Sequence, residues 1–159
     1  MKHNSLGLPV KESEELVIEL NGLLSNFQMY YQNLRGLHWN IRGKRFFDLH
    51  LKFEELYNDS QIKIDLIAER VLTLGGTPLH TFSDYIEHSK LQIGKNISND
   101  VDAIQLILAS LSILLQIERV ILNKAAEIND EGTNSMMSDF IAEQEKTNWM
   151  LKAWMEEEI

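Results

Sequence analysis

The stretch from His38 to Glu69 reads HWNIRGKRFFDLHLKFEELYNDSQIKIDLIAE and decides both the fold and the chemistry of this chain. Most of it has the periodicity of one long helix. That helix carries two pairs of possible metal ligands, His50 with Glu54 and Asp65 with Glu69, and His38 lies just upstream. Each pair has i,i+4 spacing, so its two side chains share a helix face.

Helix geometry predicts that one copy of the chain cannot complete this site. With His50 at zero and about 100° per residue, Glu54 lies near ~40°, Asp65 near ~60° and Glu69 near ~100°, all on one stripe. Along the axis, however, Glu54 and Asp65 are about 16 Å apart. Because a transition metal such as zinc binds imidazole or carboxylate at only ~2.0–2.2 Å, no single ion can bridge the two pairs.

An antiparallel two-fold contact between two copies resolves the difficulty, because residue i of one helix then faces residue j of the other and j faces i. His50 and Glu54 of one chain would meet Asp65 and Glu69 of its mate, and His38 could reach the same place. Two imidazoles and three carboxylates suit iron(II), manganese or zinc better than copper(I) or calcium. The alternative is an ordinary solvated acidic face. The apolar flanks argue against it: Phe46, Phe47, Leu49, Phe53, Leu56, Ile62, Ile64, Leu66 and Ile67.

Composition indicates one soluble globular domain over residues 1–159, with residues 1–12 as a flexible N-terminal segment. The chain is 44% hydrophobic and has no cysteine. No apolar run approaches the ~18–20 residues that span a membrane, and no signal peptide is evident, so we expect a cytoplasmic protein without a membrane partner. The net charge of −9 argues against a general nucleic-acid binder and agrees with a protein that attracts cations.

Four long helices are predicted, at about 13–37, 45–74, 99–128 and 134–157. Ser13 is the expected N-cap of the first, and Gly75 and Gly76 end the second. The third is apolar on more than one face, which favours burial against both the bundle and a neighbouring subunit. An apolar seam marks the first helix: Leu16, Leu20, Leu23, Phe27, Tyr30, Leu34 and Leu37.

The connection over 75–99 is too long for a simple hairpin, and 81–88 is predicted to form a short helix within it. Such a crossover lets two successive long helices run parallel, as in ferritin-like bundles. The predicted fold class is therefore all-α, a ferritin-like four-helix bundle with a short extra helix between helices 2 and 3. His80 and His88 lie in this connection and are expected to be surface residues.

Nearly the whole chain resembles the Dps family, the DNA-binding proteins of starved cells, or miniferritins. The resemblance is carried by HWNIRGKRFFDLH (residues 38–50), AERVLTLGG (68–76) and the final WMLKAW (149–154). It implies a dodecamer of four-helix subunits, built from two-fold dimers. It also implies a di-iron ferroxidase centre at each dimer interface, the place that the helical spacing indicates.

Matched residue by residue, the resemblance gives His38, His50 and Glu54 as ligands from one subunit and Asp65 and Glu69 from its mate. Many relatives have Asp at the position of Glu54, so the second iron position could shift. Trp39 lies near the centre in relatives, where it could donate one electron or only pack at the dimer contact. Acidic pores in the family correspond best to Asp130 and Glu131. Ser135 stands where some relatives have a further aspartate, and Asp139, one turn after Ser135, could compensate. The alternative for these acids is dipole stabilisation of a helix N-terminus.

The implied reaction is oxidation of iron(II) by hydrogen peroxide, more slowly by oxygen, with iron(III) mineral stored inside the shell to protect against oxidative damage. Zinc or manganese as resident metal stays open. DNA binding is expected to be weak or absent, because the two chain ends carry few basic residues. A true ferritin is disfavoured by the lack of a Glu-x-x-His motif. A non-catalytic metal-binding shell, or a DNA-compacting homologue, is the remaining alternative.

Overall fold

Five helices make up residues 1–156, the part of the chain that the computed structural model describes. Four are long: α1 (Val10–Asn40), α2 (Phe46–Thr73), α4 (Asp100–Glu127) and α5 (Glu131–Met155). The fifth, α3 (Phe82–His88), is short and lies in the long connection. The predicted all-α bundle with a short extra helix in its crossover is confirmed.

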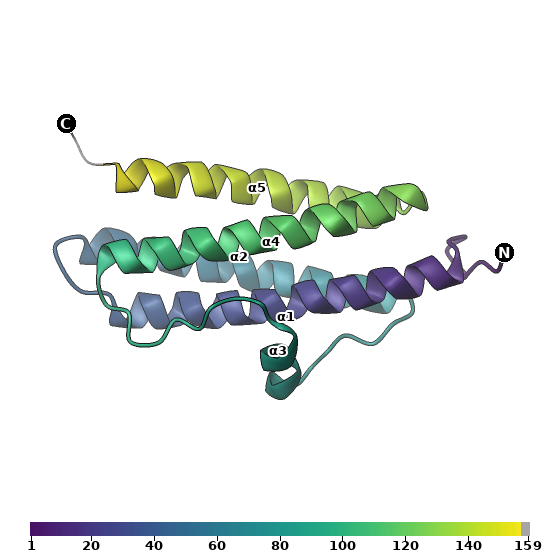
Figure 1. The fold of residues 1–159 in the computed structure, drawn as a ribbon, viewed down its shortest axis with the longest axis horizontal. Helices are drawn as coiled ribbons and strands as arrows, with labels where there is room; N and C mark the ends of the chain where they lie inside the picture. Colours follow the sequence, from purple (N-terminus) through teal and green to yellow (C-terminus); the bar gives the residue numbers. More distant parts are fainter. Residues whose placement is uncertain (157–159) are drawn as a thin grey trace.

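The crossover sets the direction of the helices. In Figure 1, α1 and α2 form one antiparallel hairpin, and α4 and α5 form a second hairpin packed on the first. The segment after α2 carries α3 and then runs back beside α1 to the start of α4, so that α2 and α4 run parallel (Figure 1). This is the arrangement that the length of the connection predicts.

The core lies between the two hairpins, and α1 supplies much of it. Every member of the predicted apolar seam of α1 is buried. The ring of Phe27 packs edge-on against Phe140 of α5, with centroids 6.0 Å apart, and so ties the first hairpin to the last helix. A helix whose apolar residues recur every three or four positions has one apolar face, and in α1 that face is buried along the predicted seam.

The start of α1 differs from the prediction. The helix begins at Val10, directly after Pro9, so residues 10–12 belong to the helix and not to an N-terminal segment. Ser13 is not the N-cap. Its buried hydroxyl donates to the carbonyl oxygen of Pro9 at 2.7 Å. Proline is well tolerated at a helix start because its missing N–H would have no partner there, and the sequence reasoning overlooked this signal.

The other helix ends are set by caps. Gly75 follows α2 with a φ of +91°, a conformation that favours glycine, as the double-glycine signal predicts. The side chain of Asn99 accepts from the backbone N–H of Asp102 and caps α4 at the expected place. The last helix begins at Glu131 instead of Asn134, because Asp130 is its N-cap. Its predicted end at residue 157 lies outside the described residues.

Helix α4 is the most apolar part of the bundle. By length and composition it is the one helix among residues 1–156 that could cross a membrane, with a mean hydropathy of 1.7 over its most apolar window. The sequence contains no uninterrupted apolar run of this length, because serine and glutamine side chains interrupt the apolar residues of α4. In the bundle, 44% of that window is buried, and the buried face also includes a carboxyl group, that of Glu118.

Candidate metal centre

His38 and His50 form the best-defined part of the predicted site. His38 lies in the last turn of α1 and His50 near the start of α2, and their rings stack with centroids 3.7 Å apart and planes 13° from parallel. The Nδ1 atom of His38 lies 2.6 Å from the carbonyl oxygen of His50, and the Nδ1 atom of His50 lies 2.7 Å from the carbonyl oxygen of His38. The two contacts are reciprocal.

This reciprocity fixes which ring nitrogen can bind a metal. A carbonyl oxygen only accepts hydrogen bonds, so each Nδ1 must carry the hydrogen. In the neutral rings, both Nε2 atoms then keep a free lone pair. Metal-ligating histidines are commonly held in this way, with the other ring nitrogen donating to a carbonyl or carboxylate. The backbone carbonyl of each histidine therefore orients the imidazole ring of the other for metal binding.

The turn between α1 and α2 brings the two histidines together. Gly43 has a φ of +116° and allows the chain to reverse, and Ile41 anchors the turn in the core at 3% exposure. The ring of Phe46 stacks on the free face of His50, with centroids 4.8 Å apart. The imidazole pair is thus held between the end of α1 and an aromatic ring of α2.

Glu54 lies one turn after His50 on α2 and is partly buried. Tyr57 follows it, and the edge of the Tyr57 ring contacts His38 with centroids 5.4 Å apart. Burial raises the pKa of the Tyr57 hydroxyl, and the nearby negative charge of Glu54 raises this pKa further. Tyr57 therefore lies between Glu54 and the histidine pair within one chain.

Asp65 and Glu69 are exposed, further along the same unbroken helix. At ~1.5 Å per residue, they lie about 16 Å or more beyond Glu54. Within residues 1–156 of a single copy, no three His, Asp or Glu side chains come together in a way that could hold a metal. One chain thus carries two half-sites, an imidazole-rich one and a carboxylate one.

Large exposed apolar residues share the stripe of α2 that carries these half-sites. Counted from His50, Leu72 and Phe47 fall near ~40–60° and Leu51, Ile62 and Leu66 near ~100–160°, overlapping the ~0–100° of the ligands. The exposure of these five side chains ranges from 41% for Leu66 to 82% for Phe47. Contiguous exposed apolar surface marks an interaction site, so this face of α2 has the character of an interface.

Trp39 follows His38 but turns outward, with 58% of its surface exposed. The guanidinium carbon of Arg35 lies 5.1 Å from the centroid of the Trp39 ring and 5.1 Å from that of Tyr31. Tyr31 in turn contacts Tyr57 edge-on at 5.9 Å. One arginine therefore lies over the rings of both Tyr31 and Trp39.

The three predicted pore residues differ in their surroundings. Asp130 is 2% exposed, and its carboxylate caps α5 and pairs with Arg70 at 2.6 Å. It therefore presents no free carboxylate to solvent, and its role in this chain is structural. Glu131 and Asp139 are both exposed. The tertiary pairing with Arg70 could not be read from the sequence.

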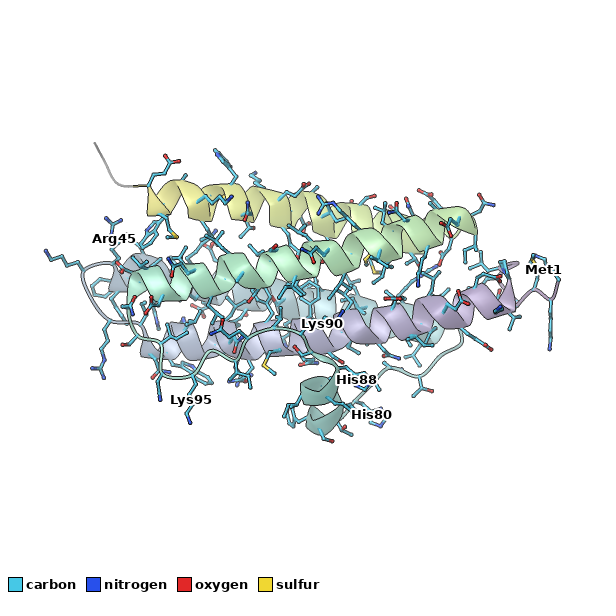
Figure 2. All side chains as sticks on the ribbon, in the orientation of Figure 1. Met1, Arg45, His80, His88, Lys90 and Lys95 are labelled. Carbon is cyan, nitrogen blue, oxygen red and sulfur yellow. The ribbon has the colours of Figure 1, made fainter. Side chains whose placement is uncertain are left out.

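His80 and His88 do not join the centre. Both are exposed, as predicted. Figure 2 shows them around α3, away from the end of the bundle marked by Arg45, where α1 passes into α2.

A buried polar cluster inside the bundle was not predicted. Glu118 of α4 is fully buried, and the side-chain amide of Gln144 donates to its carboxylate. Burial raises the pKa of Glu118 to about 8, opposed by the Gln144 hydrogen bond and by the charge of Lys63. Burial also raises the pKa of Tyr30 beside it. The sequence holds one signal for this cluster: Glu118 lies one turn after Leu114, on the apolar face of α4.

Comparisons with known proteins agree with this architecture. A family model described as a ferritin-like domain matches residues 18–158. A protein of Haemophilus influenzae, described only as uncharacterized, is 45% identical over 96% of each chain. A DNA protection during starvation protein of Porphyromonas gingivalis is 42% identical over 93% of each chain.

The same relationship holds in three dimensions. A crystal structure of a Dps protein from Vibrio cholerae O1 superimposes with a TM-score of 0.96, at 47% identity over 98% of each chain. That protein is described as a member of a broad superfamily of ferritin-like diiron-carboxylate proteins. With a bundle, crossover and short helix matched over nearly the whole length, the chain belongs to the Dps family of the ferritin-like superfamily.

Proposed function

We propose that this protein is a ferroxidase that oxidises iron(II) with hydrogen peroxide at a centre shared by two copies of the chain. The observation that carries the proposal is the His38–His50 pair, in which each backbone carbonyl holds the other imidazole with its Nε2 lone pair free. The exposed apolar stripe on α2 supports it, since the carboxylates of Asp65 and Glu69 lie on the same face.

In the assembled centre, His38, His50 and Glu54 of one copy would bind iron together with the Asp65 and Glu69 carboxylates of a second copy. Carboxylates are hard ligands and stabilise iron(III) relative to iron(II), so they favour oxidation. Two iron(II) ions supply the two electrons that one hydrogen peroxide accepts, giving two iron(III) and two hydroxide ions. No hydroxyl radical is released when both electrons are delivered together.

The product would be stored as iron(III) mineral in a hollow dodecamer, in the cytoplasm, where it protects against oxidative damage. Glu131 and Asp139 remain candidates for the iron entrance, because their carboxylates are exposed. The net charge of −9 favours cation entry over contact with nucleic acid, so direct DNA binding is expected to be weak or absent. Oxygen is expected to act more slowly than peroxide.

The test is anaerobic loading of the purified protein with two iron(II) per centre, followed by one equivalent of hydrogen peroxide. We expect iron(III) absorbance to rise much faster than in buffer that holds the same iron. A rate equal to that of buffer would contradict the ferroxidase assignment. If iron(II) is still bound, that result favours the alternative of a non-catalytic metal-binding shell, with zinc or manganese as possible resident metals.

DNA compaction, the other alternative, predicts a different result. A gel shift at nanomolar protein concentration and physiological salt would support it. The first twelve residues have Lys2 and Lys11 as their only lysines, which leaves few partners for phosphates. We therefore expect no shift under these conditions.

A further inference from the structure

Lys63 of α2 is a buried lysine whose ammonium lies at the edge of the polar cluster inside the bundle. Its Nζ atom lies 2.5 Å from a carboxylate oxygen of Asp59, one turn earlier on α2, and 2.6 Å from one of Glu143 on α5. The centroid of the Phe140 ring lies 5.3 Å away. Both carboxylate side chains are more than half exposed, whereas the lysine side chain is only 4% exposed. The ammonium therefore closes the bundle interior at this point.

An unpaired oxygen lies on the interior side of the cluster, where Glu118 and Gln144 are both buried. The Nε2 atom of Gln144 donates to the Glu118 carboxylate and to the carbonyl oxygen of Phe140. Its buried Oε1 atom has no hydrogen-bond partner within residues 1–156. Burial raises the pKa of Glu118 and the positive charge of Lys63 lowers it, so the two groups are close. Because a buried oxygen without a partner costs free energy, Oε1 is an unused ligand in this cluster.

The oxygens around Nζ are spaced as they are around a hard metal ion. Magnesium and calcium lie about 2.0–2.6 Å from their oxygen ligands, and the two carboxylate oxygens lie 2.5 and 2.6 Å from Nζ. Carboxylate and carbonyl oxygens also suit manganese(II). A groove of about 290 Å³ between α2 and α5 opens beside Lys63, and Asp139 adds a third carboxylate to its lining. The groove gives a small cation a route from solvent.

This place is separate from the centre shared by two copies. Counted from His50 as zero, Asp59 falls near ~180° and Lys63 near ~220° on the wheel of α2, whereas the ligands of the centre fall within ~0–100°. Lys63 therefore faces α5 of its own chain, where it contacts Glu143, and not the stripe that carries the two half-sites.

We propose that the Lys63 ammonium fills a divalent-cation site between α2, α4 and α5, and that a hard metal ion binds there once the ammonium is removed. The ligands would be the carboxylates of Asp59, Glu143 and Glu118 and the Oε1 atom of Gln144. An ammonium is a compact point charge, so it takes the place of a metal ion without supplying an open coordination position.

The consequence concerns where iron can bind. While the ammonium is present, no three His, Asp or Glu side chains within residues 1–156 come together in a way that could hold a metal. Removal of the ammonium leaves three carboxylates at one place without their cation: Asp59, Glu143 and Glu118. Lys63 is therefore a specificity-determining residue that excludes metal ions from the bundle and confines iron to the inter-subunit centre. Only this confinement of iron rests on the proposed function.

The experiment counts bound manganese(II) by equilibrium dialysis at about pH 8, where metal ions compete well with protons for carboxyl groups. We expect Lys63→Ala to bind about one ion per chain more than wild type. Lys63→Ala combined with Glu118→Gln should lose this extra ion, because the buried carboxylate is gone. Lys124→Ala is the matched control, since it breaks a surface ion pair with Glu19, and it should bind the wild-type number. The inter-subunit ligands are unchanged in all four proteins, so their contribution cancels.

Thermal unfolding gives a second readout that applies even if Lys63→Ala is poorly stable. A ligand that binds only the folded state stabilises it, so manganese(II) should raise the melting temperature of Lys63→Ala more than that of wild type or the double variant. Equal ion counts and equal melting shifts in Lys63→Ala and wild type would overturn the proposal. An extra ion that persists after Glu118→Gln would also overturn it, because Asp59 and Glu143 would then bind that ion at the surface. Neither outcome affects the ferroxidase test, which uses the wild-type chain.

Discussion

His50→Ala is expected to lower the rate of peroxide-driven iron(II) oxidation by about 100-fold or more. The variant loses one imidazole ligand, and it also loses the Nδ1 donor that contacts the carbonyl oxygen of His38. Loss of a group that only orients a metal ligand already costs about 10–100-fold in affinity or activity. Removing the ligand itself should cost at least as much.

The matched control is His88→Ala, because His88 is exposed on α3 and does not join the centre. We expect this variant to oxidise iron(II) at the wild-type rate. The assay is iron(III) absorbance after stopped-flow mixing, with helicity and assembly of both variants verified by circular dichroism and size-exclusion chromatography. Equal rates in His50→Ala and wild type would show that the imidazole pair does not bind the reacting iron.

The second large effect is a loss of stability as the pH rises, caused by Glu118. Its carboxyl group is fully buried in the bundle, and its pKa is raised by that burial from 4.5 to about 8. Between these values the folded protein holds a proton that the unfolded chain has released. The stabilisation is complete below the unfolded pKa and is lost as the pH rises through the folded one. Between the two pKa values, the free energy of unfolding falls by up to about 1.4 kcal/mol per pH unit.

Glu118→Gln removes the ionisable group and keeps a polar side chain of similar size. We expect the free energy of unfolding of this variant to change less between about pH 5 and about pH 8 than that of wild type, with the difference in favour of the variant at the higher pH. Chemical denaturation at several pH values measures it. When the curve of the variant is subtracted from that of wild type, the contributions of groups that titrate equally in both proteins cancel, including those of the exposed histidines. Parallel curves would show that Glu118 ionises normally.

The polar and charged groups around Glu118 come from its own helix and from three others. Tyr30 of α1, Lys63 of α2 and Gln144 of α5 face it, together with Arg119 next to it on α4. Lys63 is itself held by Asp59 and Glu143 at 2.5 and 2.6 Å, so its ammonium is engaged at the surface side of the cluster. The lowering effect of Gln144, Lys63 and Arg119 on the Glu118 pKa is smaller than the raising effect of burial.

Much of the fold follows from local sequence. The apolar seam of α1, the double glycine after α2 and the long connection predict the helices and the parallel course of α2 and α4. The errors lie at helix starts, where Pro9 and Asp130 replace the expected Ser13 and Asn134. Asp130 is a favourable N-cap that accepts from the backbone N–H of Thr133, a local signal that the prediction overlooked. Its ion pair with Arg70, which is distant in sequence, could not be read from a local pattern.

The candidate centre could be predicted in part for a similar reason. Spacing on a helix reveals which side chains share a face, and so it identifies His50, Glu54, Asp65 and Glu69 as one stripe. It cannot reveal that the imidazole of each of His38 and His50 reaches the backbone carbonyl oxygen of the other. Nor does it predict the arginine over two aromatic rings, because that contact depends on side-chain conformations.

The central claim is that each centre draws its ligands from two copies of the chain, and a mixing experiment tests it most directly. His50→Ala and Asp65→Ala are each expected to be inactive alone. If they are co-expressed with different tags, a shared centre is intact whenever the imidazoles come from an Asp65→Ala chain and the carboxylates from a His50→Ala chain. Random two-fold pairing makes about one quarter of the centres intact.

We therefore predict recovery of about one quarter of the wild-type rate of iron(II) oxidation in the mixed assembly. Native mass spectrometry must first show that both chains are present in the same particles. No recovery in particles that contain both chains would contradict the account, because a centre built within one chain stays broken in every copy of either variant.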